Sequence, residues 1–180
     1  EKLKGVSRID SLNKILNWGG IELSKKEKEY WLDIKNSFYL KCIYKISPSE
    51  LLPGISKLIE DSKQSGFKIA LGSASKNAIL ILEKVNLINS FDEIVDGTIV
   101  SLSKPSPEVF LRGAKLLKLL PEQCLVFEDA QSGVFAAKNA GMKCIAVGNT
   151  VNLEGADVVV ESLKEISDIK SFISEYIIEE

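Results

Sequence analysis

Hydrophobic and polar residues follow two different patterns along the chain. Residues 7–18 carry apolar side chains at helical spacing, and a Ser-x-x-Glu capping pattern at Ser24 opens a second helical stretch that reaches about residue 46. After Ser47, short apolar runs without alternation take turns with amphipathic segments. Such runs are typical of strands that are buried on both faces, so this part predicts a parallel sheet with helices on both faces.

The second part of the chain divides into ten predicted elements. Helices are expected at about 53–65, 76–86, 106–120, 131–141 and 162–177, and strands at 67–75, 91–97, 124–129, 143–148 and 156–160. Ser106 and Pro107 are expected to be the N-cap and the first residue of the third helix. The pattern therefore predicts an α/β fold with a helical part at 1–46 and an α/β core at 47–180.

The composition is that of a globular protein and argues against several kinds of partner and site. The chain has 180 residues, 45% of them hydrophobic, and a net charge of −2, which fits one globular unit and gives no basic field for a nucleic-acid partner. Its three cysteines form no C-x-x-C pair and it has no histidine, which argues against a zinc site and a disulfide framework. The apolar runs are shorter than a membrane span and no signal pattern opens the chain. We expect a cytoplasmic monomer without membrane or nucleic-acid partners.

Polar residues with phosphate chemistry follow three of the predicted strands. Ser73 ends the first strand, Lys104 lies in the loop that follows the second, and Glu128 and Asp129 end the third. Because ligands in open α/β sheets lie beyond the carboxyl ends of the strands, we expect these side chains to share one edge. A hydroxyl and a lysine can hold phosphate oxygens, and two adjacent carboxylates can hold Mg²⁺. The set therefore favours phosphoryl transfer.

Each of these residues also has a purely structural interpretation. Glu128 or Asp129 could cap the helix that follows and complement its dipole. Lys104 could be a solvated surface lysine, and Ser73 could be a hydroxyl satisfied within a turn between strand and helix. Only their joint occurrence at successive strand ends favours the chemical interpretation.

Several longer segments resemble one family. The chain is similar, over essentially its whole length, to the haloacid-dehalogenase-like phosphotransferases, and within them to enzymes that move phosphate between C1 and C6 of β-glucose. The segments that carry the resemblance are LKGVSRIDS (3–11), IKNSFY (34–39), LGSASKN (71–77), SKPSPEVF (103–110), EDAQSG (128–133) and the AVG strand (146–148). The resemblance implies a haloacid-dehalogenase-like Rossmannoid core, with residues 1–46 as the last portion of a helical cap.

The resemblance also implies a role for each residue that matches the family's motifs. Two phosphate sites, a sugar site and a Mg²⁺ site are expected, which makes sugar phosphates the small-molecule partners. The residues are Ser73, Ala74 (backbone) and Lys104 for the transferring phosphate, Arg8, Ser75, Lys76 and Asn77 for the other phosphate, Ser11 and Lys35 for the sugar, and Glu128 and Asp129 for Mg²⁺. Without the resemblance, Arg8 would be an exposed arginine at a helix start and Lys35 a solvated lysine.

One departure from the family's pattern changes the expectation. The family's nucleophile and general acid/base are the aspartates of a D-x-D motif on the first, central strand, and no D-x-D occurs in these 180 residues. We expect that strand to come from a segment ahead of Glu1, because a sheet without its middle strand leaves buried backbone groups unpaired, at about 1–3 kcal/mol each.

The expected activity depends on those aspartates. With them, the resemblance implies Mg²⁺-dependent interconversion of β-glucose 1-phosphate and glucose 6-phosphate through an aspartyl-phosphate. The chain without them is expected to be inactive. The alternatives are a sugar-phosphate or nucleotide phosphatase of the same fold, and a catalytically dead relative that binds sugar phosphates or a receiver-like domain.

Overall fold

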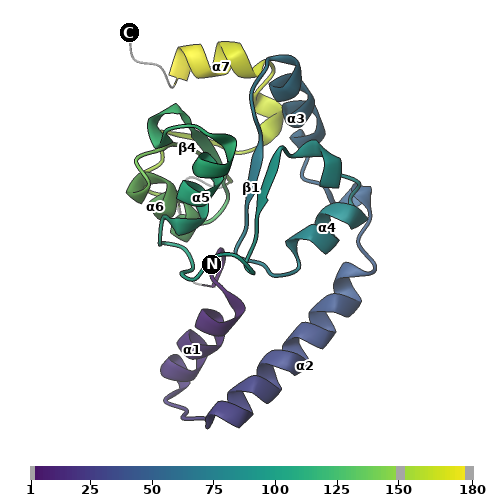
Figure 1. Ribbon diagram of the computed structural model, residues 1–180, viewed down its shortest axis with the longest axis vertical. Coiled ribbons are helices and arrows are strands. Elements are labelled where there is room, and N and C mark those ends of the chain that lie inside the picture. Colours follow the sequence, from purple (N-terminus) through teal and green to yellow (C-terminus); the bar gives the residue numbers. More distant parts are fainter. Residues whose placement is uncertain (1–2, 149–152, 177–180) are drawn as a thin grey trace.

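Two helices open the chain in the computed structural model, which describes residues 3–148 and 153–176. They are α1 (Arg8–Gly19) and α2 (Lys25–Ile43), and Figure 1 shows them extending away from the rest of the molecule. The hydroxyl of Ser7 caps α1 by accepting a hydrogen bond from the Asp10 amide. The capping box predicted between Ser24 and Glu27 is confirmed at the start of α2.

The rest of the chain alternates helices and parallel strands, as predicted. The helices are α3 (Ile55–Gln64), α4 (Ala78–Lys84), α5 (Glu108–Leu117), α6 (Gln131–Asn139) and α7 (Ile169–Tyr176); the strands are β1 (Ala70–Gly72), β2 (Glu93–Val95), β3 (Leu125–Glu128), β4 (Lys143–Val147) and β5 (Val158–Val160). Short 3₁₀ turns lie at Pro48–Glu50, Ile88–Ser90, Pro121–Gln123 and Leu163–Glu165. The predicted α/β class is therefore confirmed.

The strands form two parallel sheets instead of one. β1 pairs with β2, and β3, β4 and β5 pair in that order; within the described residues no ladder joins β1 to β3. The division falls where the sequence leads us to expect a further strand. Helix α5 packs against β1, β2 and α6, so it contacts both parts of the core. In Figure 1 the group formed by β4, α5 and α6 lies beside β1.

Three predicted boundaries are wrong for local reasons. The strand predicted at 67–75 is confined to β1. After Gly72 the hydroxyls of Ser73 and Ser75 accept backbone hydrogen bonds that shape a turn, and before Ala70 the Ile69 amide donates to the Asp92 side chain. Pro107, not Ser106, is the N-cap of α5. The closing helix expected at 162–177 is split into a 3₁₀ turn and α7, and its residue 177 lies outside the described residues.

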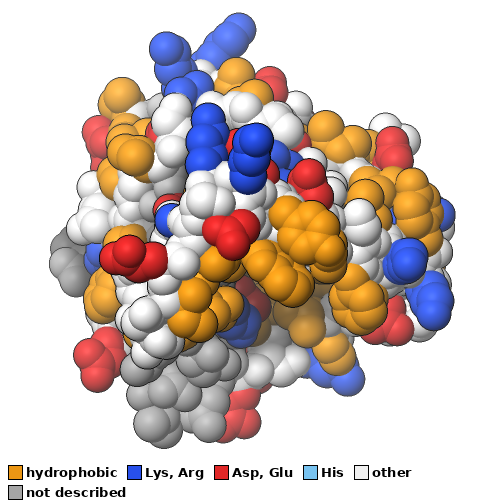
Figure 2. Space-filling model, turned by 90° about the horizontal axis from the view of Figure 1, so that it is seen from below, with side chains coloured by type: hydrophobic (Ala, Val, Ile, Leu, Met, Phe, Trp, Pro, Cys, Tyr) orange, Lys and Arg blue, Asp and Glu red, His pale blue; other side chains and the backbone are white. Residues whose placement is uncertain are grey.

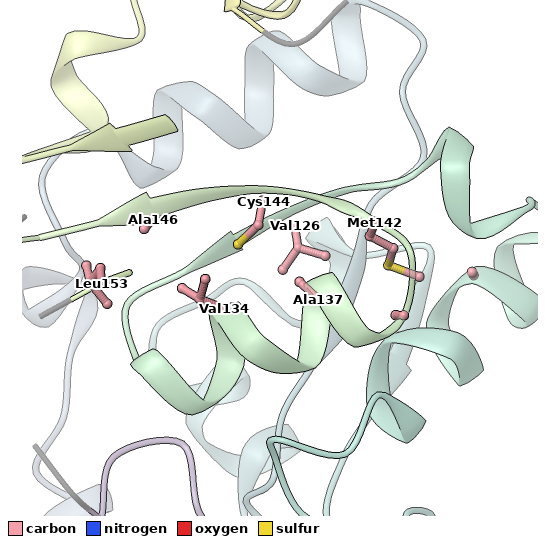
Figure 3. Close-up of a cluster of buried hydrophobic side chains, with 9 residues drawn as sticks. Val126, Val134, Ala137, Met142, Cys144, Ala146 and Leu153 are labelled. Carbon is pink, nitrogen blue, oxygen red and sulfur yellow. The ribbon is translucent and has the colours of Figure 1, made fainter. Parts of the chain in front are cut away.

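The main core lies between α6 and the three-stranded sheet. Figure 3 shows Val134 and Ala137 of α6 pointing toward Val126 of β3 and Cys144 of β4. The small side chains of α6 let this helix approach the sheet closely, and several core side chains are fully buried. A second cluster, formed by Leu58, Leu163, Ile166 and Ile169, joins α3 to the C-terminal part of the described chain. The core thus fixes the strand ends that carry the predicted site.

By contrast, α1 and α2 contribute little to a core. Among their described residues only Leu16 and Ile43 are buried. Large apolar side chains exposed on these helices and the loop between them are Ile9, Ile15, Trp18, Ile21, Tyr30, Trp31, Ile34 and Phe38. Figure 2, seen from this end of the molecule, shows hydrophobic side chains interspersed with charged ones. Within the described residues, no helix combines the length and the apolar character needed to cross a membrane.

Candidate functional site

Lys104 lies buried between the two sheets, with only 7% of its surface exposed. Its ammonium donates to the carbonyl of Gly72 at 3.3 Å, forms an ion pair with Glu128, and lies 4.7 Å from the centre of the Phe110 ring. The amide of Ser73 bonds to β2, so the Gly72 carbonyl points to the opposite edge of β1. A buried cation needs such partners. Lys104 is therefore not a solvated surface lysine, which was the alternative interpretation of this residue.

Glu128 is held by backbone amides as well as by the lysine. One of its carboxylate oxygens accepts hydrogen bonds from the amides of Asp129 and Ala130, at 3.1 and 3.3 Å. Gly133 of α6 lies directly against the carboxylate, and a Cβ atom there would overlap the carboxyl carbon and both oxygens. The N-cap of α6 is Ala130, so neither Glu128 nor Asp129 is the cap residue, although Glu128 accepts a hydrogen bond from the Ala130 amide.

Asp129 faces outward and meets the N-terminal segment. The ammonium of Lys4 lies 3.1 Å from a carboxylate oxygen of Asp129 and donates to its backbone carbonyl at 2.8 Å. The hydroxyl of Ser132 donates in turn to the Lys4 carbonyl at 2.9 Å. The segment before α1 is therefore fastened over the start of α6.

Ser73 opens a turn that its own hydroxyl helps to shape. The Ser73 hydroxyl accepts a hydrogen bond from the Ser75 amide at 3.1 Å, and the Ser75 hydroxyl accepts one from the Asn77 amide at 3.1 Å. Behind the turn, Gly97 lies so close to the carbonyl of Ala74 that a Cβ atom would collide with it. Each serine hydroxyl retains a proton with which to donate, so the turn can both hold its shape and bind an oxygen ligand.

Arg8 and Lys35 form a second positively charged region, on α1 and α2. The Arg8 guanidinium donates to the carbonyl of Leu32 at 3.4 Å, and the Lys35 ammonium lies 4.4 Å from the centre of the Tyr39 ring. Lys35 is largely exposed, yet burial of its ammonium end and then the charge of Arg8 lower its pKa. These two side chains are therefore close enough for their charges to interact.

A hydrogen bond joins this region to the serine turn. The side-chain amide of Asn77 donates to the side-chain oxygen of Asn36, the neighbour of Lys35, at 3.1 Å. Among the other predicted residues, Ser11 is half-buried on α1 and Lys76 is exposed in the turn. The structure thus brings α2, at Asn36, against the 75–77 turn. At the strand ends, Lys104 joins Glu128 to Gly72, the residue before Ser73.

Asp10 makes polar contacts that were not predicted from the sequence. Its carboxylate accepts hydrogen bonds from the hydroxyls of Ser103 and Ser7. Those two hydroxyl groups, with a smaller contribution from Lys14, lower the pKa of Asp10 against the opposing effect of burial. The spacing of Ser7 and Asp10 is that of a helix cap, which could have indicated the local bond but not the contact with the loop that carries Lys104.

The acidic pair offers suitable ligands for a hard cation. Within the part of the chain that the structure describes, no group of three or more His, Cys, Asp or Glu residues could hold a metal. Glu128 and Asp129 are adjacent in the sequence, but the Glu128 carboxylate is buried on Lys104 whereas that of Asp129 faces outward. The Lys4 ammonium already lies on two oxygens of Asp129. Oxygen donors that accept a cation fit Mg²⁺, which usually retains several waters and needs few protein ligands.

Comparison with known proteins finds relatives within one family of hydrolases and phosphotransferases. A family model described as haloacid dehalogenase-like hydrolase matches residues 3–147. The β-phosphoglucomutase of Bacillus subtilis is 40% identical over 169 residues, which cover 93% of this chain and 75% of the relative. A phosphorylated carbohydrates phosphatase of Thermotoga maritima is 36% identical over 132 residues, covering 67% of this chain and 61% of the relative.

A solved structure supports the same relationship. The crystal structure of β-phosphoglucomutase from Clostridium difficile superposes with a TM-score of 0.93 at 39% sequence identity, covering 99% of this chain and 82% of that one. The resemblance inferred from the motifs is thereby confirmed for the fold and the family. The chain belongs to the haloacid dehalogenase-like hydrolase family and is a homologue of β-phosphoglucomutase.

Proposed function

We propose that this chain forms part of a Mg²⁺-dependent β-phosphoglucomutase, which interconverts β-glucose 1-phosphate and glucose 6-phosphate. The observation that carries the proposal is the position of Lys104, whose buried ammonium lies between the end of β1, next to Ser73, and the carboxylate of Glu128. The 40% identity to the β-phosphoglucomutase of Bacillus subtilis supports the choice of reaction. In this proposal residues 1–46 act as part of a cap and residues 47–180 as the core.

The core residues would hold the phosphoryl group that is transferred. The Ser73 hydroxyl and the Ala74 amide would donate to its oxygens, and Lys104 would neutralise the charge that grows in the transition state. Lys104 is buried, so its charge is screened less by solvent than that of a surface lysine. Glu128 would keep the ammonium in place through its ion pair.

The proposed reaction also needs a metal ion and a nucleophile. Asp129 would hold Mg²⁺, together with whatever acceptor capacity the Glu128 carboxylate retains beside its ion pair with Lys104, and the metal would supply positive charge to the phosphate oxygens. An aspartate on a strand between β1 and β3 would act as the nucleophile, supplied by a further part of the polypeptide or by a partner. Without that aspartate, Ser73 and Lys104 can bind and orient a phosphate but cannot accept the phosphoryl group.

The second positively charged region distinguishes a mutase from a simple phosphatase. A mutase must hold a phosphate at each end of the sugar, and Arg8 with the 75–77 turn would hold the one that does not react. Lys35 and Ser11 would contact the sugar from the helical part. The hydrogen bond between Asn36 and Asn77 and the electrostatic effect of Arg8 on Lys35 support this second site.

Binding of a doubly phosphorylated sugar tests the two sites without requiring the nucleophile. Calorimetry should show that β-glucose 1,6-bisphosphate binds more tightly than glucose 6-phosphate. Arg8→Gln and Ser73→Ala should each remove most of this advantage, whereas Lys28→Met, remote from both sites, should not. Equal affinity for the two sugars would contradict the two-site proposal.

A product assay decides between the mutase and its nearest alternative. The similarity to the phosphorylated carbohydrates phosphatase of Thermotoga maritima favours a sugar-phosphate phosphatase as the second candidate. The protein, assembled with its aspartate-bearing strand, is given β-glucose 1-phosphate, and glucose 6-phosphate and free phosphate are measured together. Glucose 6-phosphate should predominate; predominant phosphate release would reject the mutase.

A further inference from the structure

The Lys4 ammonium lies on Asp129, the residue that the proposed function takes as a metal ligand. Its ammonium contacts two oxygens of this one residue, the backbone carbonyl at 2.8 Å and a carboxylate oxygen at 3.1 Å. We propose that Lys4 is a built-in counter-ion that Mg²⁺ replaces, so that metal binding frees the segment before α1 from the start of α6. This inference rests on the proposed function, because it takes Asp129 as a metal ligand.

The burial of the two acids explains why the exchange would take place at Asp129. The Glu128 side chain is 7% exposed and is already occupied by Lys104 and two backbone amides. The Asp129 side chain is 52% exposed and that of Lys4 is 43% exposed. An ion pair open to water is weak and exchanges readily, so an incoming cation can displace Lys4 without opening the core.

Lys4 also belongs to the contacts that position the helical part. Its carbonyl accepts the hydrogen bond from Ser132, and the next residue, Gly5, has a φ of +72° and lies against Ser132 and Ala130. Arg8, at the start of α1, follows only a few residues later. Release of the Lys4 ammonium would therefore loosen the link between α1 and α6 close to the second phosphate site.

Competition between Lys4 and Mg²⁺ for Asp129 can be measured through thermodynamic linkage. If Lys4 and Mg²⁺ compete for Asp129, removal of the lysine must tighten Mg²⁺ binding, and Mg²⁺ must weaken the hold on Lys4. In calorimetric titrations, Lys4→Met should lower the Mg²⁺ dissociation constant about two- to fivefold, the range expected for an exposed ion pair. Lys28→Met is the matched control, because Lys28 carries the same charge but donates to Asn13, in the middle of α1.

A second measurement follows the lysine itself. The protein is treated briefly with an amine-acylating reagent with and without Mg²⁺, and the modification of each lysine is quantified by peptide mass spectrometry. Mg²⁺ should increase the labelling of Lys4 several-fold and leave that of Lys28 unchanged. Equal labelling of Lys4 in both conditions would overturn the proposal.

The outcomes separate this inference from the proposed function. Tighter Mg²⁺ binding by Lys4→Met, together with Mg²⁺-dependent labelling of Lys4, supports both. Mg²⁺ binding with the same affinity in wild type, Lys4→Met and Lys28→Met rejects the role of Lys4 and retains the metal site. Absence of Mg²⁺ binding in wild type and in both variants rejects the metal part of the proposed function, and the role of Lys4 with it.

Discussion

The Lys104 ammonium and the Glu128 carboxylate form a buried ion pair that links the carboxyl ends of β1 and β3. These strands belong to different sheets, so the pair joins the two parts of the core at the position where the phosphate chemistry is expected. Its surroundings include the Gly72 carbonyl and two backbone amides, which satisfy further hydrogen-bonding groups of both side chains. The pair therefore contributes both to the fold and to the candidate site.

Truncating one member of this pair should be costly. Lys104→Met leaves a carboxylate buried without its cation, and we expect the free energy of unfolding to fall by about 3–5 kcal/mol. The double variant Lys104→Met/Glu128→Leu should lose less than the sum of the two single variants, because neither charge remains unpaired. Urea unfolding of the four proteins measures the coupling, and strictly additive losses would contradict it.

Two helical glycines should respond in opposite ways to replacement by alanine. In Gly133→Ala the new methyl group collides with the Glu128 carboxylate, so we expect a loss of stability of about 1–3 kcal/mol and weaker phosphate binding. Gly113, on α5, is the matched control: a Cβ atom there would lie 3.8 Å from that of Ala70, an ordinary contact. Gly113→Ala should stabilise the protein by up to about 1 kcal/mol. Thermal unfolding compares the two variants.

The contacts of Asp10 should make part of the stability depend on pH. Its pKa is lowered below the ordinary value of 3.8 by the hydroxyls of Ser103 and Ser7, so its contribution is present at neutral pH. The contribution is lost as the pH falls below 3.8 and through the lowered pKa of the folded state. Asp10→Asn should cost about 1 kcal/mol at pH 7, and this cost should shrink progressively as the pH falls below 3.8, as measured by urea unfolding. Asp33→Asn, at an exposed position of α2, controls for the loss of one negative charge.

Arg8 should be detectable through the titration of Lys35. Burial and then the Arg8 charge lower the pKa of Lys35 from 10.5, so Arg8→Gln should raise it part of the way back. Because the folded pKa is lowered, the unfolded chain binds more protons between that pKa and 10.5, and Lys35 should add stability as the pH rises through this range. Carbon NMR of the lysine side chain gives the pKa. An unchanged value in Arg8→Gln would show that the two charges do not interact.

The three cysteines should differ in reactivity. Cys42 is exposed, whereas burial raises the pKa of Cys144 to about 12, with smaller contributions from Glu128 and Asp157. The pKa of Cys124 is also raised, by burial and by Glu122. Because the thiolate is the reactive form, a thiol reagent at pH 8 should modify Cys42 fastest and Cys144 only after unfolding. Cys42→Ser should remove the fast phase; a fast phase that persists would contradict this order.

The sequence was most informative where local patterns decide the structure. Helical periodicity and the capping box at Ser24 predicted α1 and α2, and unbroken apolar runs predicted the strands, because burial on both faces leaves a direct record in composition. Strand ends also predicted that Lys104 and Glu128 meet beside the end of β1, since parallel strands place their carboxyl ends at one edge. Asp129, expected at the same edge, faces outward and pairs with Lys4.

Contacts between distant segments could not be predicted in this way. No local pattern indicates that Asp10 meets Ser103, that Lys4 meets Asp129, or that Asn36 meets Asn77, because each pair depends on how the helical part rests on the core. The division into two sheets is likewise a property of strand order and not of any single strand. The short extent of β1 reflects serine hydroxyls that compete with the ladder for backbone amides, a choice that composition does not reveal.

The packing of helix α5 couples the two parts of the core mechanically. This helix packs against β1 and β2 and contacts α6, and the loop that carries Lys104 runs directly into its first turn. A shift of the β1–β2 sheet relative to α6 and the three-stranded sheet would therefore move α5, and with it the Lys104 ammonium. Distant substitutions that alter this alignment should then change the position of the Lys104 ammonium, and with it the phosphate affinity that the proposed function requires, without replacing any residue of the candidate site.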